Sequence, residues 1–353
     1  MNKLFQISVV SLILISNYVV GQQKLSLNDA VKITLENNLD IKIVENQDEI
    51  FKNNASFLNS GYLPTISSNA GINKSEQNIE IETPNNLSGK LDNMKSENSF
   101  SNISLNYILL DNSGRNFNYK KSKELSNRSK LEVKEVIENT LLQLFTVYYE
   151  VCRLFEEREI IKSSLEISKT RLERKNTEFE FGQSTKLEVL NAEVDVNTDS
   201  IKLLSSIQNL SNAKRDLNLI MNVELNSNYD LDRNVIYNSK NKISEFYKNA
   251  AENNTRLKIY DKSVDISNYE LKSIKSTYLP TIGLVGSYDW NESINDNPYA
   301  FFNKNIYDGI SGGINLSWNI FNSGKRITAN KNAKIKLENS KIEKEKVFLI
   351  FQK

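Results

Sequence analysis

The 353-residue sequence contains no histidine, one cysteine and four prolines. Without histidine, the usual general base and the commonest metal ligand are missing. The single Cys152 cannot form an intrachain disulfide. Because proline interrupts helices, so few prolines permit long continuous ones. Basic and acidic residues number 45 and 44, which leaves no excess of basic charge for nucleic-acid binding. We therefore expect no cofactor, no metal and no nucleic-acid partner.

Long apolar runs are also absent after residue 21, where none approaches the roughly 20 residues of a spanning helix. Residues 1–21 read as a signal peptide, with Lys3 before the apolar Leu4–Ile15 and small residues at Val19–Gly21. The alternative, a transmembrane anchor, is disfavoured by Asn17 and the short apolar core. We expect an exported chain without a helical membrane span and without a lipid-attachment cysteine.

One pattern occurs twice. Glu36-Asn37-Asn38 leads through a helical run to Tyr62-Leu63-Pro64-Thr65-Ile66, and Glu252-Asn253-Asn254 leads to Tyr278-Leu279-Pro280-Thr281-Ile282. The offset is 216 residues at both ends (252 − 36 and 278 − 62). A repeat this long is neither a solenoid unit nor a propeller blade. It predicts one unit, a helix followed by a β-hairpin, built twice in residues 22–241 and 242–353.

The first repeat is predicted to begin with one helix over residues 25–59. A β-hairpin over 64–110 follows, with strands at 64–73 and 100–110 and a solvated loop at 74–98. A helical hairpin over 116–221, with helices at 116–175 and 187–221, and a connector over 222–241 complete the repeat. The longer helix would approach about 90 Å, too long for a compact globule.

The second repeat is predicted to hold a helix from Lys242 to Tyr278, a β-hairpin over 280–321 with a polar loop at 291–308, and the start of a helix. Pro64 and Pro280 mark the passages from helix to strand, because proline disfavours a helical residue before it. Gly114 and Gly324 mark the returns to helix. From those glycines the first repeat runs 108 residues to its connector (222 − 114) and the second 29 to its end (353 − 324). We expect a C-terminally truncated chain that lacks about 79 residues, its final helical hairpin.

Each strand is predicted to be about ten residues long, with one apolar and one polar face. The clearest case alternates Ile310, Ile314, Leu316, Trp318 and Ile320 with polar residues. This length and alternation are typical of transmembrane β-strands, for which Tyr107, Tyr288, Trp290 and Trp318 would be membrane-interface aromatics. Four strands cannot stay an open sheet in lipid, so several copies would have to contribute. The alternative is a water-soluble sheet with one buried face.

The helical hairpin carries apolar residues at coiled-coil spacing: Ile137, Leu141, Leu144, Tyr148, Val151 and Phe155, then Leu190, Val194, Ile201, Leu204, Leu210 and Leu217. By itself this hairpin would support a second hypothesis, a periplasmic coiled-coil scaffold or interaction protein without a pore. An enzyme is the third. The ionisable residues of 148–150 and 156–159 fit a seam beside a solvated charged face, and Cys152 fits a buried packing thiol. The sequence shows no phosphate loop, metal spacing or nucleophile motif.

Taken in order, these residues resemble the TolC-like outer-membrane efflux proteins. Leu25-Ser26-Leu27 with Ala30 and Asn37-Asn38 is similar to that family's opening, and the two Tyr-Leu-Pro sequences to its entries from helix into strand. Leu105-x-Tyr107-x-x-Leu110-Asp111 and Leu316-x-Trp318-x-x-Phe321-Asn322, each before Gly-Arg or Gly-Lys, are similar to its exits. The stretch 181–190 resembles its helical-hairpin tip.

The resemblance, which covers residues 25–353, implies an α+β membrane protein that forms a homotrimer. Each protomer would give four strands to a 12-stranded outer-membrane β-barrel, and the helices would form a periplasmic α-helical barrel. Phe181, Gly182, Gln183 and Ser184 would be the adaptor-docking tip, and an inner-membrane pump would supply the energy. The function implied is a passive conduit for efflux or type I secretion, lined by uncharged Ser, Thr, Asn and Gly.

Overall fold

The computed structural model describes residues 24–82, 88–234, 253–297 and 301–352. The chain divides into two compact units, residues 1–47 with 132–253 and residues 48–131 with 254–353. The predicted signal peptide, and the parts of the predicted connector and second-repeat helix within 235–252, lie outside the described residues. Over the described ranges, no helix has both the length and the apolar character needed to cross a membrane.

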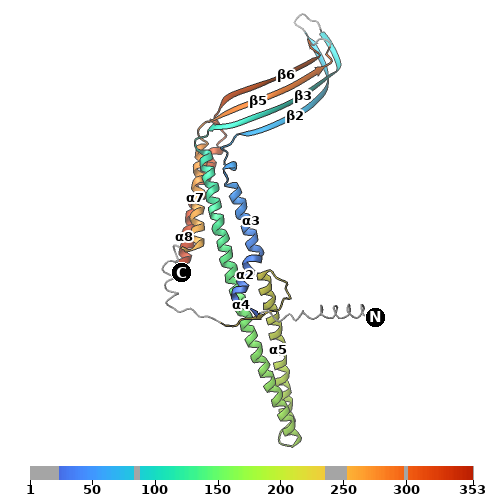
Figure 1. The fold of residues 1–353 in the computed structure, drawn as a ribbon, viewed down its shortest axis with the longest axis vertical. Helices are drawn as coiled ribbons and strands as arrows, with labels where there is room; N and C mark the ends of the chain where they lie inside the picture. The colour runs from blue at the N-terminus through green and yellow to red at the C-terminus, as the bar shows by residue number, and fades with distance from the viewer. Residues whose placement is uncertain (1–23, 83–87, 235–252, 298–300, 353) are drawn as a thin grey trace, which may run out of the picture. The chain divides into compact units, whose positions relative to one another are not determined.

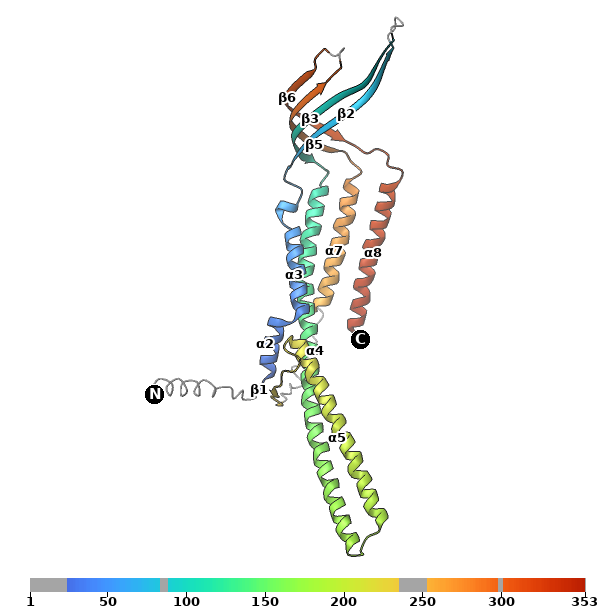
Figure 2. The same cartoon turned by 90° about the vertical axis from the view of Figure 1, so that its right-hand side faces the viewer.

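Two long helices form an antiparallel hairpin (Figures 1 and 2), which from residue 132 onward belongs to the first unit. Helix α4 spans Gly114–Glu180 and α5 spans Lys186–Met221. The predicted helical hairpin is therefore confirmed. At about 1.5 Å per residue, the 67 residues of α4 make a helix of about 100 Å, somewhat longer than predicted.

The single helix predicted over residues 25–59 is wrong. The structure has strand β1 (Lys24–Leu25), helix α2 (Leu27–Asn37), helix α3 (Leu39–Asn54) and a short 3₁₀ helix (Phe57–Asn59). Asn38 makes the break. Its backbone is extended (φ −56°, ψ 132°), its Oδ1 accepts from the amides of Asp40 and Ile41, and its Nδ2 donates to the Ile220 carbonyl at 2.9 Å. The side chain thus replaces the helical hydrogen bonds that the break removes.

The core of the first unit lies where α4 and α5 meet a two-stranded parallel sheet, β1 with β4 (Asp230–Leu231). Tyr148 is 1% exposed, and its hydroxyl lies 3.0 Å from the Leu25 carbonyl and 2.9 Å from the Asp232 carbonyl. It joins the long helix to both short strands. Around it packs a cluster of buried residues: Leu25, Ala30, Leu144, Val151, Cys152, Leu154, Leu210, Ala213, Leu217, Ile220, Met221 and Leu231.

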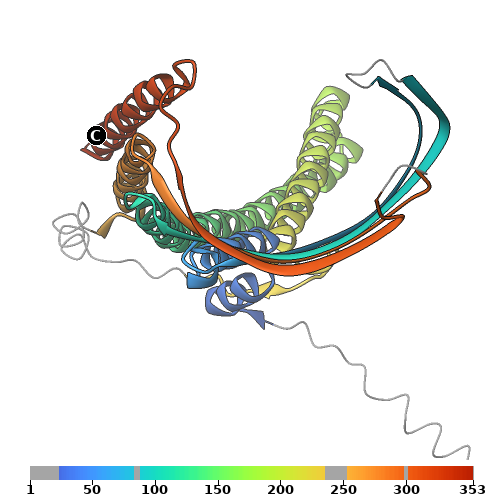
Figure 3. The same cartoon turned by 90° about the horizontal axis from the view of Figure 1, so that it is seen from above.

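The second unit contains one four-stranded sheet in the order β2-β3-β5-β6. The strands are β2 (Thr65–Glu82), β3 (Ser88–Leu110), β5 (Thr281–Asn295) and β6 (Lys304–Ser317), and all neighbours are antiparallel. Seen from above, the sheet is strongly curved (Figure 3). Helices α7 (Thr255–Ser276) and α8 (Lys325–Gln352) lie side by side (Figures 1 and 2) and are joined by Lys344–Asp261 at 2.6 Å.

The loop predicted over residues 74–98 is wrong, because β2 and β3 continue through most of it. Their composition is polar, but the side chains pair across the strands. Lys74 and Glu97 lie 3.0 Å apart, and the Ser75 and Ser96 hydroxyls 2.7 Å apart. Cross-strand pairs of this kind stabilise a sheet without an apolar face. Polar composition in this stretch therefore reflects cross-strand pairing and not a loop.

The second hairpin needs the same correction. The predicted loop at 291–308 is mostly strand, with a Lys304–Glu292 ion pair between β5 and β6. At its other end β6 stops at Ser317, so Trp318 and Ile320 lie outside the strand. The reason is that β5 begins only at Thr281, after Pro280, and the last pair is Thr281 with Ser317.

Candidate functional site

The two faces of the curved sheet differ in chemistry. In an antiparallel sheet, directly opposed residues project to the same face and alternate residues to opposite faces. Away from the two irregularities, at Gln77–Ile79 and Ile108–Leu110, the pairing register therefore assigns the paired residues to a row and a face. One face is polar over most of its rows, and the other is largely apolar from the Ile282–Leu316 row to the Tyr288–Ile310 row, with charged side chains beyond.

The polar face is built of hydroxyl and amide rows. One row runs Ser67, Ser104, Ser287 and Ser311 across all four strands. The Ser67 and Ser104 hydroxyls lie 2.9 Å apart, and those of Ser287 and Ser311 lie 2.8 Å apart. The next row runs Asn69, Asn102, Asp289 and Gly309. The predicted Ser, Thr, Asn and Gly lining describes this face well, but leaves out the carboxylate of Asp289.

The opposite face carries large exposed apolar side chains in paired rows. On β6 alone, Ile310 is 87% exposed and Ile314 is 72% exposed, which is unusual for aliphatic side chains. From Ile306 to Leu316 this strand runs about 33 Å, or about 25 Å along the normal once tilted by about 40°. That length is comparable with the height of the apolar band on outer-membrane barrels, although Asp308 and Gly312 lie within it on the same face. Other members of the face are Ile66, Ile72, Ile103, Leu105, Ile282 and Leu284.

Three of the four predicted interface aromatics lie on strands of this face, and the fourth, Trp318, follows β6. Tyr288 and Trp290 lie on β5 toward the β5–β6 loop, where the Tyr288 hydroxyl donates to Asp308 at 3.1 Å. Tyr107 pairs with Leu284, nearer the helices. Trp318 follows the end of β6, and its indole Nε1 donates to the Tyr278 carbonyl at 3.2 Å. On this face a single row, Ile66, Leu105, Gly286 and Gly312, separates the Tyr107 row from the Tyr288 row.

An arginine clamp closes each junction between sheet and helices. The guanidinium of Arg115 lies 5.1 Å from the Tyr62 ring centre and donates to the Gly61 and Leu109 carbonyls. The guanidinium of Arg326 lies 4.7 Å from the Tyr278 ring. It donates to the carbonyls of Thr277, Asn319 and Ile320. The two tyrosines are those of the repeated Tyr-Leu-Pro sequences.

The clamps show that the predicted glycines are not equivalent. Asp111 and Asn322 each accept from the backbone amide four residues on, that of Arg115 or Arg326. This register makes Gly324 the counterpart of Ser113, and both have positive φ (78° and 68°). Gly114 is required for a different reason, because a Cβ there would lie 2.6 Å from the Ser276 hydroxyl. The Gly-Arg and Gly-Lys pairs of the sequence are therefore offset by one residue from the structural repeat.

Pro64 and Pro280 lie where predicted, one residue before β2 and β5. The Pro280 carbonyl also accepts a hydrogen bond from the Asn112 side chain at 2.7 Å. The repeated asparagines are equivalent too, since Asn254 caps α7 by accepting from the Leu257 amide at 2.9 Å, as Asn38 does for α3. The two copies therefore share the capping asparagine and the proline before the strand, whereas α3 ends at Asn54 and α7 continues to Ser276.

The turn between α4 and α5 contains the four predicted tip residues. Gly182 has φ +71° and donates to the Phe179 carbonyl, while Gln183 donates to the Glu178 carbonyl; these are the two bonds of a Schellman helix end. Thr185 then caps α5 in a reciprocal capping box with Glu188. Two helix ends with this chemistry make a defined turn, and the Phe181 ring at its apex is 76% exposed.

Helix α5 has two apolar stripes where one was predicted. Val189, Ala192, Leu210, Ala213 and Leu217 are buried. Of the predicted seam residues, Leu190, Val194, Ile201 and Leu204 are exposed instead, at 46–67%. The spacing from 190 to 204 is that of a coiled-coil seam, so the prediction identified a stripe that this chain leaves uncovered. The α4 part of the predicted seam is confirmed at Leu144, Tyr148 and Val151.

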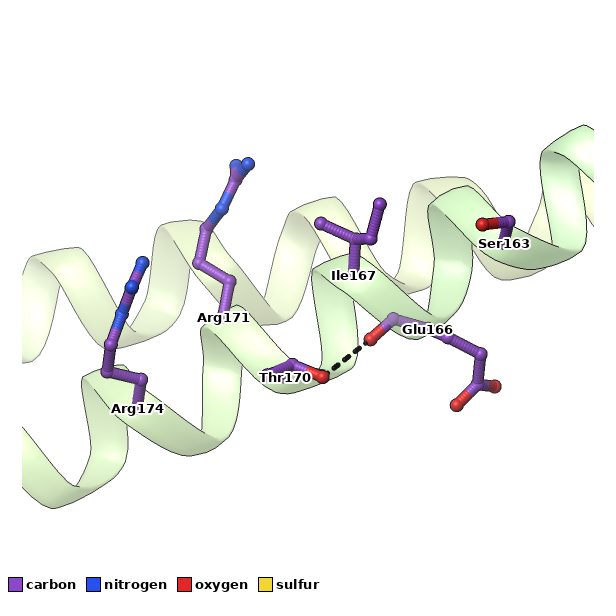
Figure 4. Close-up of a pocket in the computed structure, with 6 residues that line it drawn as sticks. All are labelled: Ser163, Glu166, Ile167, Thr170, Arg171 and Arg174. Atoms are coloured by element: carbon purple, nitrogen blue, oxygen red, sulfur yellow. Dashed lines mark hydrogen bonds between the residues drawn. The ribbon is translucent and has the colours of Figure 1, made fainter.

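A shallow groove of about 380 Å³ lies along α4, before the tip (Figure 4). It is lined from one helix by Ser163, Glu166, Ile167, Thr170, Arg171 and Arg174. The Thr170 hydroxyl donates to the Glu166 carbonyl of its own helix, and Arg171 and Arg174 project alongside Ile167 (Figure 4). The groove combines the apolar Ile167 with the charged side chains of Glu166, Arg171 and Arg174.

The residues weighed for an enzyme have structural roles. Burial raises the pKa of Tyr148 to about 12, and burial also raises the pKa of the Cys152 thiol, so both groups stay protonated and unreactive near neutrality. Glu150 and Glu157 form exposed ion pairs with Arg153. Within the described ranges, no group of three His, Cys, Asp or Glu side chains could hold a metal ion.

Three comparisons place this geometry among known proteins. A family model described as outer membrane efflux protein matches residues 30–223. The structure of the outer membrane protein VceC of Vibrio cholerae aligns with TM-score 0.72 and 10% identity, over 92% of this chain and 75% of VceC. The Campylobacter jejuni CmeC outer membrane channel aligns with TM-score 0.73 and 16% identity, over 92% and 68%. The outer-membrane channel OprN aligns with TM-score 0.68 and 13% identity, over 92% of this chain and 71% of OprN. No curated protein matches the sequence.

Proposed function

The chain belongs to the outer membrane efflux protein family, whose members are outer-membrane channels with a periplasmic helical domain and not enzymes, and we propose that it is the passive outer-membrane conduit of a tripartite efflux or type I secretion system. The observation that carries the proposal is the two-faced sheet. One face exposes Ile310 and Ile314 to the surroundings, and the other carries hydrogen-bonded serines. A sheet of that design separates lipid from water.

The sheet needs further strands to serve in a membrane. Its outer strands, β2 and β6, each have one unpaired edge in the described part of the chain. In lipid an unpaired backbone edge is costly, so the edges must close on one another or on other copies. Four strands are too few for a bacterial barrel, which has at least 8. Three copies would give a 12-stranded barrel, and the strong curvature of the sheet (Figure 3) supports that closure.

The helices are proposed to form the periplasmic body. The uncovered stripe of Leu190, Val194, Ile201 and Leu204 on α5 would pack against helices of the assembly. The exposed Phe181 and the turn of Gly182, Gln183 and Ser184 would dock on a periplasmic adaptor, which links the conduit to an inner-membrane pump. The groove beside Arg171 and Arg174 extends that contact surface along α4. The proposal also includes a chain organised as two structural repeats, residues 22–241 and 242–353.

The conduit needs no catalytic group because the pump would supply the energy. Selectivity in such a pore comes from its width and from the polarity of its lining. Rows of serine and asparagine bind small molecules weakly and without strict geometry. The proposal therefore includes a broad range of exported substrates.

The test uses neighbouring residues on opposite faces. In a C152S background, single cysteines replace Ile310 (apolar face) and Ser311 (polar face), which are adjacent on β6 and both exposed. The full-length protein is purified from outer membranes and reconstituted in vesicles. A fluorophore attached to Ile310→Cys should be quenched by nitroxide lipids. In unlabelled protein, the thiol of Ile310→Cys should not react with a charged thiol reagent, whereas the thiol of Ser311→Cys should react.

A heat-sensitive trimer on an unheated gel and pores in planar bilayers should accompany this result. The alternative, a coiled-coil scaffold without a pore, predicts a soluble protein, equal reaction at both cysteines and no conductance. For the docking tip, Phe181→Ala should weaken co-purification with the adaptor. Phe301→Ala is the matched control, because the Phe301 ring in the β5–β6 loop is also highly exposed, at 91%.

A further inference from the structure

We propose that Asp289 sets the charge preference of the pore, favouring cations over anions through one carboxylate per chain on the polar face. The inference rests on the proposed function and adds a specificity-determining residue to it. On the polar face, the described rows from Thr281–Ser317 to Asn73–Asn305 carry this single charged side chain. Every other polar member of those rows is a neutral serine, threonine, asparagine, tyrosine or glycine.

The surroundings of Asp289 keep its charge on the open face. Asn102 lies on one side of its row and Gly309 on the other. A Cβ added to Gly309 would meet no atom within 4 Å, so no side chain covers the carboxylate from β6. Asn102 accepts at its Oδ1 from the Asn69 side chain. The Ser287 hydroxyl donates to Oδ2 of Asp289, and no lysine or arginine shares the face in these rows to neutralise it.

The neighbouring row provides a contrast within the same two strands. Asp308 is paired with Trp290, one row further on and on the apolar face. It accepts a hydrogen bond from the Tyr288 hydroxyl at 3.1 Å. The two aspartates therefore lie on the adjacent strands β5 and β6, in neighbouring rows, and on opposite faces of the sheet. A charge that acts on ions in the pore must be on the polar face.

The expected size of the effect follows from Coulomb's law with screening. In a threefold assembly three carboxylates would lie at one level, on the order of 10 Å from the axis. In 0.1 M salt, where the Debye length is also about 10 Å, they would favour cations over anions roughly two- to fivefold. In 1 M salt the Debye length falls to about 3 Å, and the preference should nearly vanish.

The experiment measures reversal potentials of the full-length protein in planar bilayers under a KCl gradient. The wild-type pore should prefer K⁺, Asp289→Asn should lose most of that preference, and Asp289→Lys should invert it. Asp289→Glu should retain the preference, and Asp308→Asn should leave it unchanged. The trimer band on an unheated gel verifies assembly of each variant.

Three results would overturn the proposal. A conducting Asp289→Asn pore with the wild-type K⁺ preference would remove the role of this residue and leave the conduit intact. An equal loss in Asp308→Asn would show that the face of the sheet does not matter. A wild-type protein that inserts without conducting would overturn the proposed function itself, and the charge preference with it.

Discussion

Replacing Tyr148 by phenylalanine removes one hydroxyl from the core of the first unit and leaves the ring in place. The hydroxyl carries one proton for two carbonyls, those of Leu25 at 3.0 Å and Asp232 at 2.9 Å. The Leu25 carbonyl keeps a second partner, the Asp232 amide at 3.0 Å, whereas the Asp232 carbonyl loses its side-chain donor. The perturbation is therefore one hydrogen bond, at a side chain 1% exposed.

A net hydrogen bond contributes about 1 kcal/mol, and a buried acceptor left unsatisfied costs about 1–3 kcal/mol. Since one of the two carbonyls keeps a partner, we expect about 1–2 kcal/mol. That energy raises the open population roughly 5- to 30-fold. Hydrogen exchange followed by mass spectrometry should show this increase in peptides that contain Leu25 or Asp232.

The control is Tyr149→Phe. The Tyr149 ring packs edge-on against Tyr148, with ring centres 5.7 Å apart, but it is only half-buried. We expect less than a twofold change in exchange. Wild-type exchange in Tyr148→Phe, or an equal increase in both variants, would refute the role assigned to the hydroxyl. The pKa of Tyr148, raised to about 12 by burial, adds a pH dependence: this stabilisation is complete below pH 10 and is lost as the pH rises through about 12.

Three further predictions concern the junctions and the tip. Arg326→Ala should destabilise its junction by about 1–3 kcal/mol, because three carbonyls lose a charged donor. The adjacent Lys325→Ala is the control and should change the stability by less than about 0.5 kcal/mol. Urea titration of the heat-sensitive trimer measures both. Gly114→Ala should destabilise through its 2.6 Å approach to the Ser276 hydroxyl, and Ser276→Ala should restore part of the loss in the same titration. Hydrogen bonds from the Ser184 hydroxyl and the Thr185 amide lower the pKa of Glu188. The contribution of this carboxylate to the stability of the tip should therefore be present above pH 4.5 and lost as the pH falls through the lowered pKa. Over that pH range, amide exchange at the tip should accelerate in wild type and not in Glu188→Gln.

Periodicity and repetition determined most of the element order. Three of these signals are local: the two Tyr-Leu-Pro sequences, the seam through Leu144, Tyr148 and Val151, and the turn at Gly182. They could be read from the sequence because each depends on residues that are close together in the chain. The family resemblance rested on the same motifs. The four-strand, long-helix fold and the membership in the outer membrane efflux proteins were therefore predictable.

Only the tertiary structure decided what depends on a partner distant in sequence. Residues 74–82 and 88–98 look like a loop until Lys74 faces Glu97 and Ser75 faces Ser96 across the sheet. The break at Asn38 needs the carbonyl of Ile220, and the stop of β6 needs the late start of β5. The stripe from Leu190 to Leu204 has the pattern of a buried seam. Whether it is buried depends on a second element that covers it, which the pattern does not determine. Register likewise gave Asp289 and Asp308 opposite faces, since a side chain's face follows from its pairing and not from its type.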